Sequence, residues 1–226
     1  MTKRGIITLL LVAVAIVAAV VIVLLTRPSG PEPEPSPVYV IALDAGHGGR
    51  DPGAVADDVM EKDLNLGIVE RLLPMIDAEP NLAAKPTRTL DIKVPNEERI
   101  QIAEDAGAMM YISIHINSFT SADADGIETI VSNTRPQDDD SWVLGELVQD
   151  ALVEATGARD RGTRAQESYL QRTEMPAISA EVGYITNPAE RAKLVDPAYQ
   201  QKIAEAILEG IRQFIAYRYP EEPAAL

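Results

Sequence analysis

The sequence contains no cysteine and only two histidines in 226 residues. The lack of cysteine excludes disulfide scaffolds, thiolate zinc sites and cysteine nucleophiles. An oxidising compartment remains compatible, because the chain has no thiol that could mispair. Basic residues are also scarce: 20 Lys and Arg stand against 35 Asp and Glu and give a formal charge of −15. This charge argues against binding of nucleic acid, which depends on neutralising phosphates, and favours a solvated surface.

The amino-terminal region contains a long apolar run, Ile6 to Leu25, in whose 20 residues Thr8 is the only polar side chain. Such a run is long enough to cross a bilayer as a helix of about 20 residues. Lys3 and Arg4 precede it and favour an amino terminus that stays in the cytoplasm. A cleaved signal peptide is the alternative, although its apolar core usually has only about 7–15 residues. We therefore expect an uncleaved anchor and, in either case, export of the remainder of the chain.

Changes in composition along the chain predict four segments. Residues 1–26 form a cytoplasmic stub and the transmembrane anchor. Residues 27–37 form a Pro-rich linker, either a semi-rigid polyproline II spacer or a disordered tether. Residues 38–219 form a globular domain long enough to bury a core, and residues 220–226 form a tail.

Within residues 38–219, short apolar runs alternate with helical patterns. This alternation predicts a three-layer α/β domain, with a mostly parallel or mixed central sheet flanked by helices. The strands are expected at 38–43, 82–87, 109–116, 126–132 and 176–182. The helices are expected at 61–77, 95–106, 138–156, from an Asn187 cap onward, and 198–217.

The two histidines each follow or close an apolar strand pattern. His47 lies in a Gly-rich turn after the first strand, and His115 shares one strand face with Ser113 by the period of two. Glu61 opens the helix that comes after the turn. A His–Glu–His set with an open fourth position is what a catalytic zinc ion needs, whereas the alternative is two structural histidines.

A further carboxylate, Glu181, closes the apolar strand before Gly183. An unpaired carboxylate is costly to bury, so a place in the core is not expected. Glu181 either forms a salt bridge with an arginine or acts as the general base that takes a proton from water.

Six motifs occur in order along residues 38–217: DAGHGGRDPGA, EKDLNL, TRTLDIKVPNEER, SIHINS, GIET and MPAISAEVGYITNP. Together they resemble the motifs of the zinc-dependent N-acetylmuramoyl-L-alanine amidases, which are bacterial cell-wall hydrolases. The resemblance implies one zinc ion held by His47, Glu61 and His115, with water completing the set. It also implies that Glu181 is the catalytic acid and base, and that the substrate is the peptidoglycan amide between the muramic acid lactyl group and L-alanine.

Other polar residues of these motifs have less defined roles. Arg88 and Arg99 either grip a substrate carboxylate or fix the loop by pairing with Asp91 or Glu97, and loop fixing is the favoured interpretation. Two residues that come after His115 are expected to orient a ligand from outside the metal's own donor set, namely Asn117 and Ser118.

Two competing functions remain open. One is a membrane-tethered peptidoglycan-binding protein without turnover, against which the intact Glu181 argues. The other is a zinc hydrolase of different substrate, such as a deacetylase.

The amidase is expected on the extracytoplasmic side of the cell membrane, held by one span, or secreted if the leader is cleaved. Ordinary helix and strand patterns fill the segment between Glu61 and His115 and indicate no autoinhibitory helix, and the sequence does not reveal an activating protein partner.

The anchor can be tested by sequencing the amino terminus of the membrane-associated protein. An uncleaved anchor predicts that the mature chain keeps the residues before Ile6 and sediments with membranes. A mature start near Thr26 or later would instead identify a signal peptide.

Overall fold

The computed structural model describes residues 16–17 and 38–220. The chain divides into two units, Met1–Ser36 and Pro37–Leu226, and the second contains the described domain. The expected anchor and linker lie almost entirely outside the described residues. Within the described ranges, no helix combines the length and the apolar character that crossing a membrane requires.

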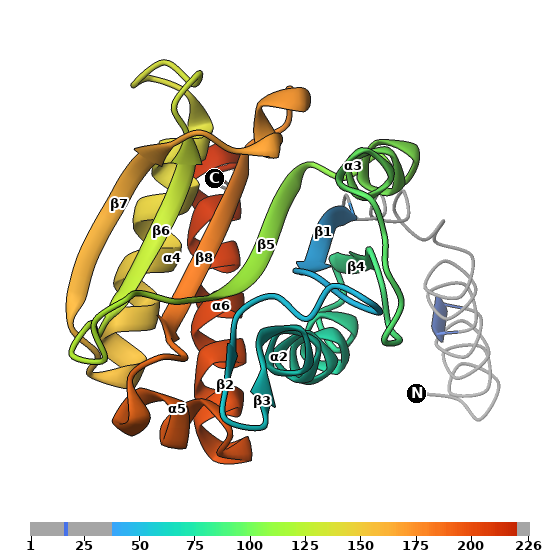
Figure 1. Ribbon diagram of the computed structural model, residues 1–226. Coiled ribbons are helices and arrows are strands. Elements are labelled where there is room, and N and C mark those ends of the chain that lie inside the picture. The colour runs from blue at the N-terminus through green and yellow to red at the C-terminus, as the bar shows by residue number, and fades with distance from the viewer. Residues whose placement is uncertain (1–15, 18–37, 221–226) are drawn as a thin grey trace, which may run out of the picture. The chain divides into compact units, whose positions relative to one another are not determined.

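A six-stranded sheet forms the centre of the domain, with the strand order β4-β1-β5-β8-β6-β7 (Figure 1). Strands β4, β1, β5 and β8 run parallel, β6 is antiparallel to β8, and β7 is parallel to β6. The sheet is therefore mixed but mostly parallel, as expected. The strands are β1 (Tyr39–Ala45), β4 (Leu82–Pro86), β5 (Met110–Asn117), β6 (Ile127–Ser132), β7 (Asp160–Gln166) and β8 (Ala177–Tyr184).

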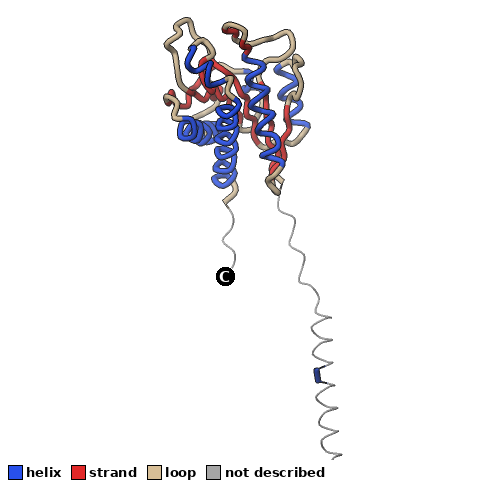
Figure 2. The backbone as a smooth tube through the Cα atoms, turned by 90° about the horizontal axis from the view of Figure 1, so that it is seen from below, coloured by secondary structure: helices blue, strands red, loops and turns tan. Residues whose placement is uncertain are grey.

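Helices cover both faces of the sheet, in unequal amounts (Figure 2). The large apolar core lies between one face and the helices α2 (Glu61–Asp77), α4 (Asp140–Thr156) and α6 (Pro197–Arg218). A smaller core on the opposite face joins α3 (Asn96–Asp105) and the short 3-10 helix η1 (Tyr169–Arg172). The short helix α5 (Pro188–Leu194) begins at the Asn187 cap, whose side chain accepts from the backbone N–H groups of two residues of its first turn.

Strand β5 shows why the two faces differ. Ile112, Ile114 and Ile116 point into the large core, where each is buried. Ser113 and His115 point to the opposite face because side chains alternate along a strand. The alternation expected from the sequence is confirmed, and it places polar groups on the face that the smaller helical layer covers only in part.

Two features of the fold were not expected from the sequence. Strand β7, with the sequence DRGTRAQ, is polar and lies at the edge of the sheet, so it lacks the apolar alternation that identifies half-buried strands. A two-stranded hairpin, β2 (Val55–Ala56) with β3 (Val59–Met60), fills the loop before α2. Its turn contains Asp57 at a φ of 51°, a left-handed conformation that Asp tolerates better than most residues.

The contact between α4 and α6 yields a stability prediction. A Cβ added at Gly210 in α6 would lie 2.7 Å from Val148 Cγ2 and 2.8 Å from Val148 Cα in α4. Because the second contact is with backbone, we expect Gly210→Ala to lower the free energy of unfolding by about 1–3 kcal/mol in chemical denaturation. The matched control is Gly67→Ala in α2, where the nearest atom is the end of the Gln200 side chain, at 2.9 Å. There the gain in helix propensity, up to about 1 kcal/mol, should keep stability near that of the wild type.

Candidate metal centre

The turn after β1 holds His47 in an uncommon backbone conformation. His47 has a φ of 61°, and the next residue, Gly48, has a φ of 130°. A left-handed histidine is strained, and such strain persists only where the surroundings fix the residue. The preceding Gly46 is required for space, because a Cβ there would lie 2.3 Å from Cε1 and 2.4 Å from Nε2 of His115. The turn therefore brings the imidazole rings of His47 and His115 close together, with ring centroids 5.0 Å apart.

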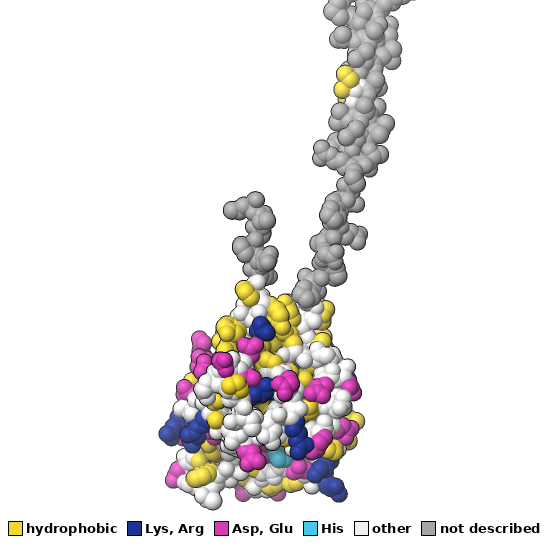
Figure 3. Space-filling model, turned by 90° about the horizontal axis from the view of Figure 1, so that it is seen from above, with side chains coloured by type: hydrophobic (Ala, Val, Ile, Leu, Met, Phe, Trp, Pro, Cys, Tyr) yellow, Lys and Arg dark blue, Asp and Glu magenta, His cyan; other side chains and the backbone are white. Residues whose placement is uncertain are grey.

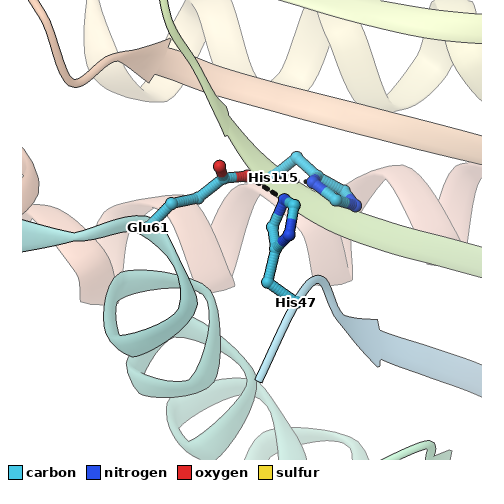
Figure 4. Close-up of side chains that lie close together, drawn as sticks. All are labelled: His47, Glu61 and His115. Atoms are coloured by element: carbon cyan, nitrogen blue, oxygen red, sulfur yellow. Dashed lines mark hydrogen bonds and ion pairs between the residues drawn. The ribbon is translucent and has the colours of Figure 1, made fainter. Parts of the chain in front are cut away.

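Three side chains from separate segments converge at the carboxyl ends of β1 and β5 (Figure 4). Glu61 Oε1 lies 2.9 Å from His115 Nδ1 and 3.2 Å from His47 Nε2. One ligand atom from each of the three residues lies within 4.8 Å of the others. Ligands of α/β sheets bind outside the carboxyl ends of strands, and this cluster occupies that position.

The backbone fixes the carboxylate of Glu61, which is buried. Its Oε2 accepts from the N–H of Ala54 at 2.8 Å, and its Oε1 accepts from the N–H of Ile116 at 3.1 Å. Gly53 leaves room for this arrangement, because a Cβ there would lie 2.5 Å from Glu61 Oε2 and 2.7 Å from His47 Cδ2. The carboxylate thus has one orientation relative to both imidazoles.

The three groups shift each other's protonation. Burial would raise the pKa of Glu61, but hydrogen bonds to His115 and His47 outweigh it and hold this pKa well below its usual range. Burial would lower the pKa of His115, but the bond to Glu61 and the charge of Glu181 raise it to about 9. The Glu61 carboxylate lies between two imidazole nitrogens, and its negative charge favours the protonated form of both histidines.

Asp51, which was not expected from the sequence, orients the ring of His47. Asp51 Oδ1 lies 3.1 Å from His47 Nδ1, the nitrogen that faces away from Glu61, and also accepts from Gly53 N–H at 3.3 Å. Carboxylates in this position fix the tautomer and the ring orientation of a metal-binding histidine. The signal was present in the sequence, because Asp51 comes four residues after His47 within the same Gly-rich motif.

Asp44, at the end of β1, is the most enclosed charge beside the site. It is fully buried and pairs with Arg99. Its carboxylate also accepts hydrogen bonds from hydroxyl groups on three other segments: Thr87 at 2.5 Å, Ser113 at 2.6 Å and Tyr169 at 2.9 Å. Burial would raise the pKa of Asp44, but Arg99 and the hydroxyls keep it below its usual value. The ionised carboxylate therefore joins β1, β5, α3 and η1.

Arg88 and Arg99 are both only 3% exposed and donate to the backbone of the His47 turn. Arg99 donates to the carbonyl of Ala45 at 2.8 Å and to the carbonyl of His47 at 2.6 Å. Arg88 donates to the same Ala45 carbonyl at 2.8 Å and to the Gly46 carbonyl at 3.0 Å. These contacts agree with loop fixing rather than with a grip on substrate.

The acidic partners expected for these arginines are wrong. Arg99 pairs with Asp44, whereas Asp91 pairs with Lys62 and Glu97 pairs with Arg172. Sequence proximity suggested Asp91 and Glu97, but the sheet brings a residue from 55 positions away next to Arg99.

Glu181 lies beside His115 on the neighbouring strand β8, where the two residues are register partners. It is partly exposed, and its carboxylate has no hydrogen-bond partner within the part of the chain that the structure describes. Removal from bulk water raises the pKa of Glu181 to about 7, against the opposing effect of His115 and with help from the charges of Glu61 and Glu128. A free carboxylate therefore faces the same side of the sheet as the two imidazoles.

Asn117 and Ser118, which were expected to orient a ligand, lie at and just after the end of β5. Asn117 donates to Glu128 Oε1 at 2.7 Å and to the Tyr184 hydroxyl at 3.3 Å. Ser118 is exposed, and its backbone N–H donates to the Asn117 side chain. Asn117 thus links β5 to Glu128, the register partner of Glu181 on β6, and its effect on a ligand stays a prediction.

Comparison with known proteins identifies this arrangement. The family model described as N-acetylmuramoyl-L-alanine amidase matches residues 41–213, a span that contains the His–Glu–His cluster and Glu181. The chain belongs to this family. The zinc-dependent amidase family expected from the motifs is confirmed, and the cluster of His47, Glu61 and His115 is consistent with one metal site.

Curated relatives have different lengths. The chain is 37% identical over 177 residues to the uncharacterised protein YqiI of Bacillus subtilis, covering 77% of this chain and 84% of YqiI. It is 34% identical over 171 residues to the N-acetylmuramoyl-L-alanine amidase LytC of the same organism, covering 75% of this chain and 34% of LytC. The chain thus corresponds to about a third of LytC.

Solved structures share the domain. The N-acetylmuramoyl-L-alanine amidase from Clostridium difficile superposes with a TM-score of 0.76 at 33% identity, covering 80% of this chain and 98% of that one. The catalytic domain of CwlV, from Bacillus (Paenibacillus) polymyxa, gives a TM-score of 0.74 at 32% identity, covering 79% and 98%. The described domain of this amidase is therefore equivalent to a whole catalytic domain.

The buried pair of Asp44 and Arg99 yields the prediction for this site. Asp44→Ala leaves a buried guanidinium and three hydroxyls without their acceptor, so we expect it to lower the free energy of unfolding by about 3–5 kcal/mol. The measurement is urea denaturation of the domain. The control is Asp125→Ala, which breaks an exposed pair with Arg159 and should change stability by no more than about 1 kcal/mol. Equal losses in the two variants would contradict a structural role for the buried pair.

Proposed function

We propose that the described domain hydrolyses the amide between the muramic acid lactyl group and L-alanine in peptidoglycan, with one zinc ion at the His–Glu–His cluster and Glu181 as acid and base. The observation that carries the proposal is the placement of Glu181. It is a free carboxylate on the strand next to His115, on the face of the sheet that carries the cluster. Family membership supports the substrate class.

The donor set suits zinc. It consists of two imidazole nitrogens and one carboxylate oxygen. Catalytic zinc sites with three protein ligands use donors of these kinds. His47 would bind through Nε2, because its Nδ1 faces Asp51, and His115 would bind through Nδ1, which faces Glu61. When bound, the metal supplies Lewis acidity that favours deprotonation of water near neutral pH and polarises the substrate carbonyl.

Glu181 moves the proton that hydrolysis requires. Water adds to the amide carbonyl and loses one proton, which the Glu181 carboxylate accepts. The same carboxyl group then gives this proton to the departing nitrogen of L-alanine as the carbon–nitrogen bond breaks. The products are the lactyl carboxylic acid and the free amine of the stem peptide, so no other co-reactant is needed. Such a positioned acid and base typically contributes about 10²–10⁴-fold to the rate.

Peptidoglycan lies outside the cytoplasm, so we place the domain on the extracytoplasmic side. The apolar run of residues 6–25 is proposed to hold it at the membrane, with residues 27–37 as the spacer. An attachment of this kind limits the reach of the enzyme to the wall near the membrane.

The two glutamates can be separated by one paired measurement of bound zinc and released stem peptide. Glu181→Gln keeps the shape but removes the base, so we expect zinc to remain bound while activity on peptidoglycan falls by about 10²-fold or more. Glu61→Gln removes an anionic ligand, so zinc content and activity should fall together.

The control for folding is the midpoint of thermal unfolding of both variants, measured with and without zinc. Full activity of Glu181→Gln would refute the proposed acid and base. Loss of zinc from Glu181→Gln together with its retention by Glu61→Gln would reverse the two roles.

A further inference from the structure

A cavity of about 470 Å³ opens beside the two histidines. His47, His115 and Tyr169 line it, together with the segment from Lys93 to Glu97, which leads into α3. Figure 3 shows histidine atoms at the surface with acidic and basic side chains close by. A substrate bound at the histidines would therefore extend into a space bounded by charged groups.

The charged side chains that line this cavity are equal in number, three carboxylates and three Lys or Arg, but not all of them form ion pairs. Its three carboxylates all have partners: Asp44 pairs with Arg99, Glu97 pairs with Arg172, and Asp51 bonds His47. Three cations line the cavity, all within the described residues. Arg99 and Arg172 each pair with a carboxylate, and Lys93 has none within ion-pair distance. Lys93 affects Asp51 only through the longer-range effect of its charge. Among the described residues its ammonium group has no ion-pair partner, in a chain whose formal charge is −15.

The backbone around Lys93 is fixed to the metal-binding turn. A Cβ added at Gly49 would lie 2.7 Å from the Lys93 backbone nitrogen and 3.3 Å from its Cβ, so the two segments are in close contact. The next residue, Val94, is buried, and its carbonyl accepts from Arg99 Nε at 2.9 Å. The side chain of Lys93 is therefore exposed at the cavity on a rigid base.

A second cavity, of about 250 Å³, shares His115 and Tyr169 with the first and is also lined by Glu181. Its other polar lining residues are uncharged except Glu167, and no lysine or arginine lines it. A ligand that carries a carboxylate is disfavoured there by like charge, whereas sugar hydroxyl and acetamido groups find hydrogen-bonding side chains. The two cavities therefore differ in the chemistry that each accepts.

We propose that the cavity lined by Lys93 receives the stem peptide, and that Lys93 binds the α-carboxylate of the residue after L-alanine. The inference rests on the proposed function, because it assumes a muropeptide at the histidines. In the stem, the second residue is linked through its side-chain carboxyl, so its α-carboxylate is the anionic group nearest the scissile amide. An ammonium group and a carboxylate form a charge-assisted hydrogen bond, which salt weakens at an exposed site.

The test compares two synthetic disaccharide tripeptides with amidated carboxyl termini, which differ only in whether the second residue carries an α-carboxylate or an α-carboxamide. Wild-type zinc-loaded enzyme should hydrolyse the carboxylate form with the higher kcat/KM. Lys93→Met should lower kcat/KM for the carboxylate form by roughly 3–10-fold and change the carboxamide form by less than about 2-fold. Lys93→Arg should keep the preference, and high salt should reduce it.

The matched control is Lys85→Met, which removes the same charge from an exposed position on β4, outside both cavities. It should leave the ratio of the two kcat/KM values unchanged. Equal hydrolysis of both substrates by the wild type, or an unchanged ratio in Lys93→Met, would overturn the role of Lys93 and leave the amidase reaction intact. Failure to hydrolyse either substrate would overturn the proposed function, and this inference with it.

Discussion

The buried ion pair between Asp44 and Arg99 is the interaction on which the site depends. It lies under the turn that carries His47 and joins the end of β1 to the start of α3. A charge pair in this position is costly to desolvate, and it is retained here with every oxygen of Asp44 bonded. Arg99 donates further N–H groups to backbone carbonyls of the turn, including that of His47. The buried pair therefore fixes the backbone position of His47.

Two glycines allow His47, Glu61 and His115 to approach one another closely. Gly46 lies against the ring of His115, and Gly53 lies against both Glu61 and His47. A Cβ at either position would overlap one or more of His47, Glu61 and His115. The geometry of the cluster therefore requires glycine at both positions. Backbone N–H groups then orient the Glu61 carboxylate, because an acceptor bonded from two sides has little freedom to rotate.

The distribution of charge explains how an acidic protein can act on an acidic polymer. The chain has a formal charge of −15, yet three cations line the first cavity beside its three carboxylates, and two of those carboxylates, Asp44 and Glu97, form ion pairs. Lys93 and any bound metal supply the positive charge there that is not held in an ion pair with a carboxylate. Local potential in a cleft, rather than net charge, governs which ligand approaches it. The carboxylate of Glu181, the proposed acid and base, lines the second cavity, which shares His115 and Tyr169 with the first.

The sequence by itself determined the fold class, the family and the residues of the cluster. Apolar runs alternating with helical patterns carry that information locally, and His47 and His115 are the only two histidines available. The polar edge strand β7 could not be found, since an exposed edge needs no apolar alternation. Only the tertiary structure decided that Arg99 pairs with Asp44, because the partner of a buried charge is set by which strands lie side by side and not by separation along the chain.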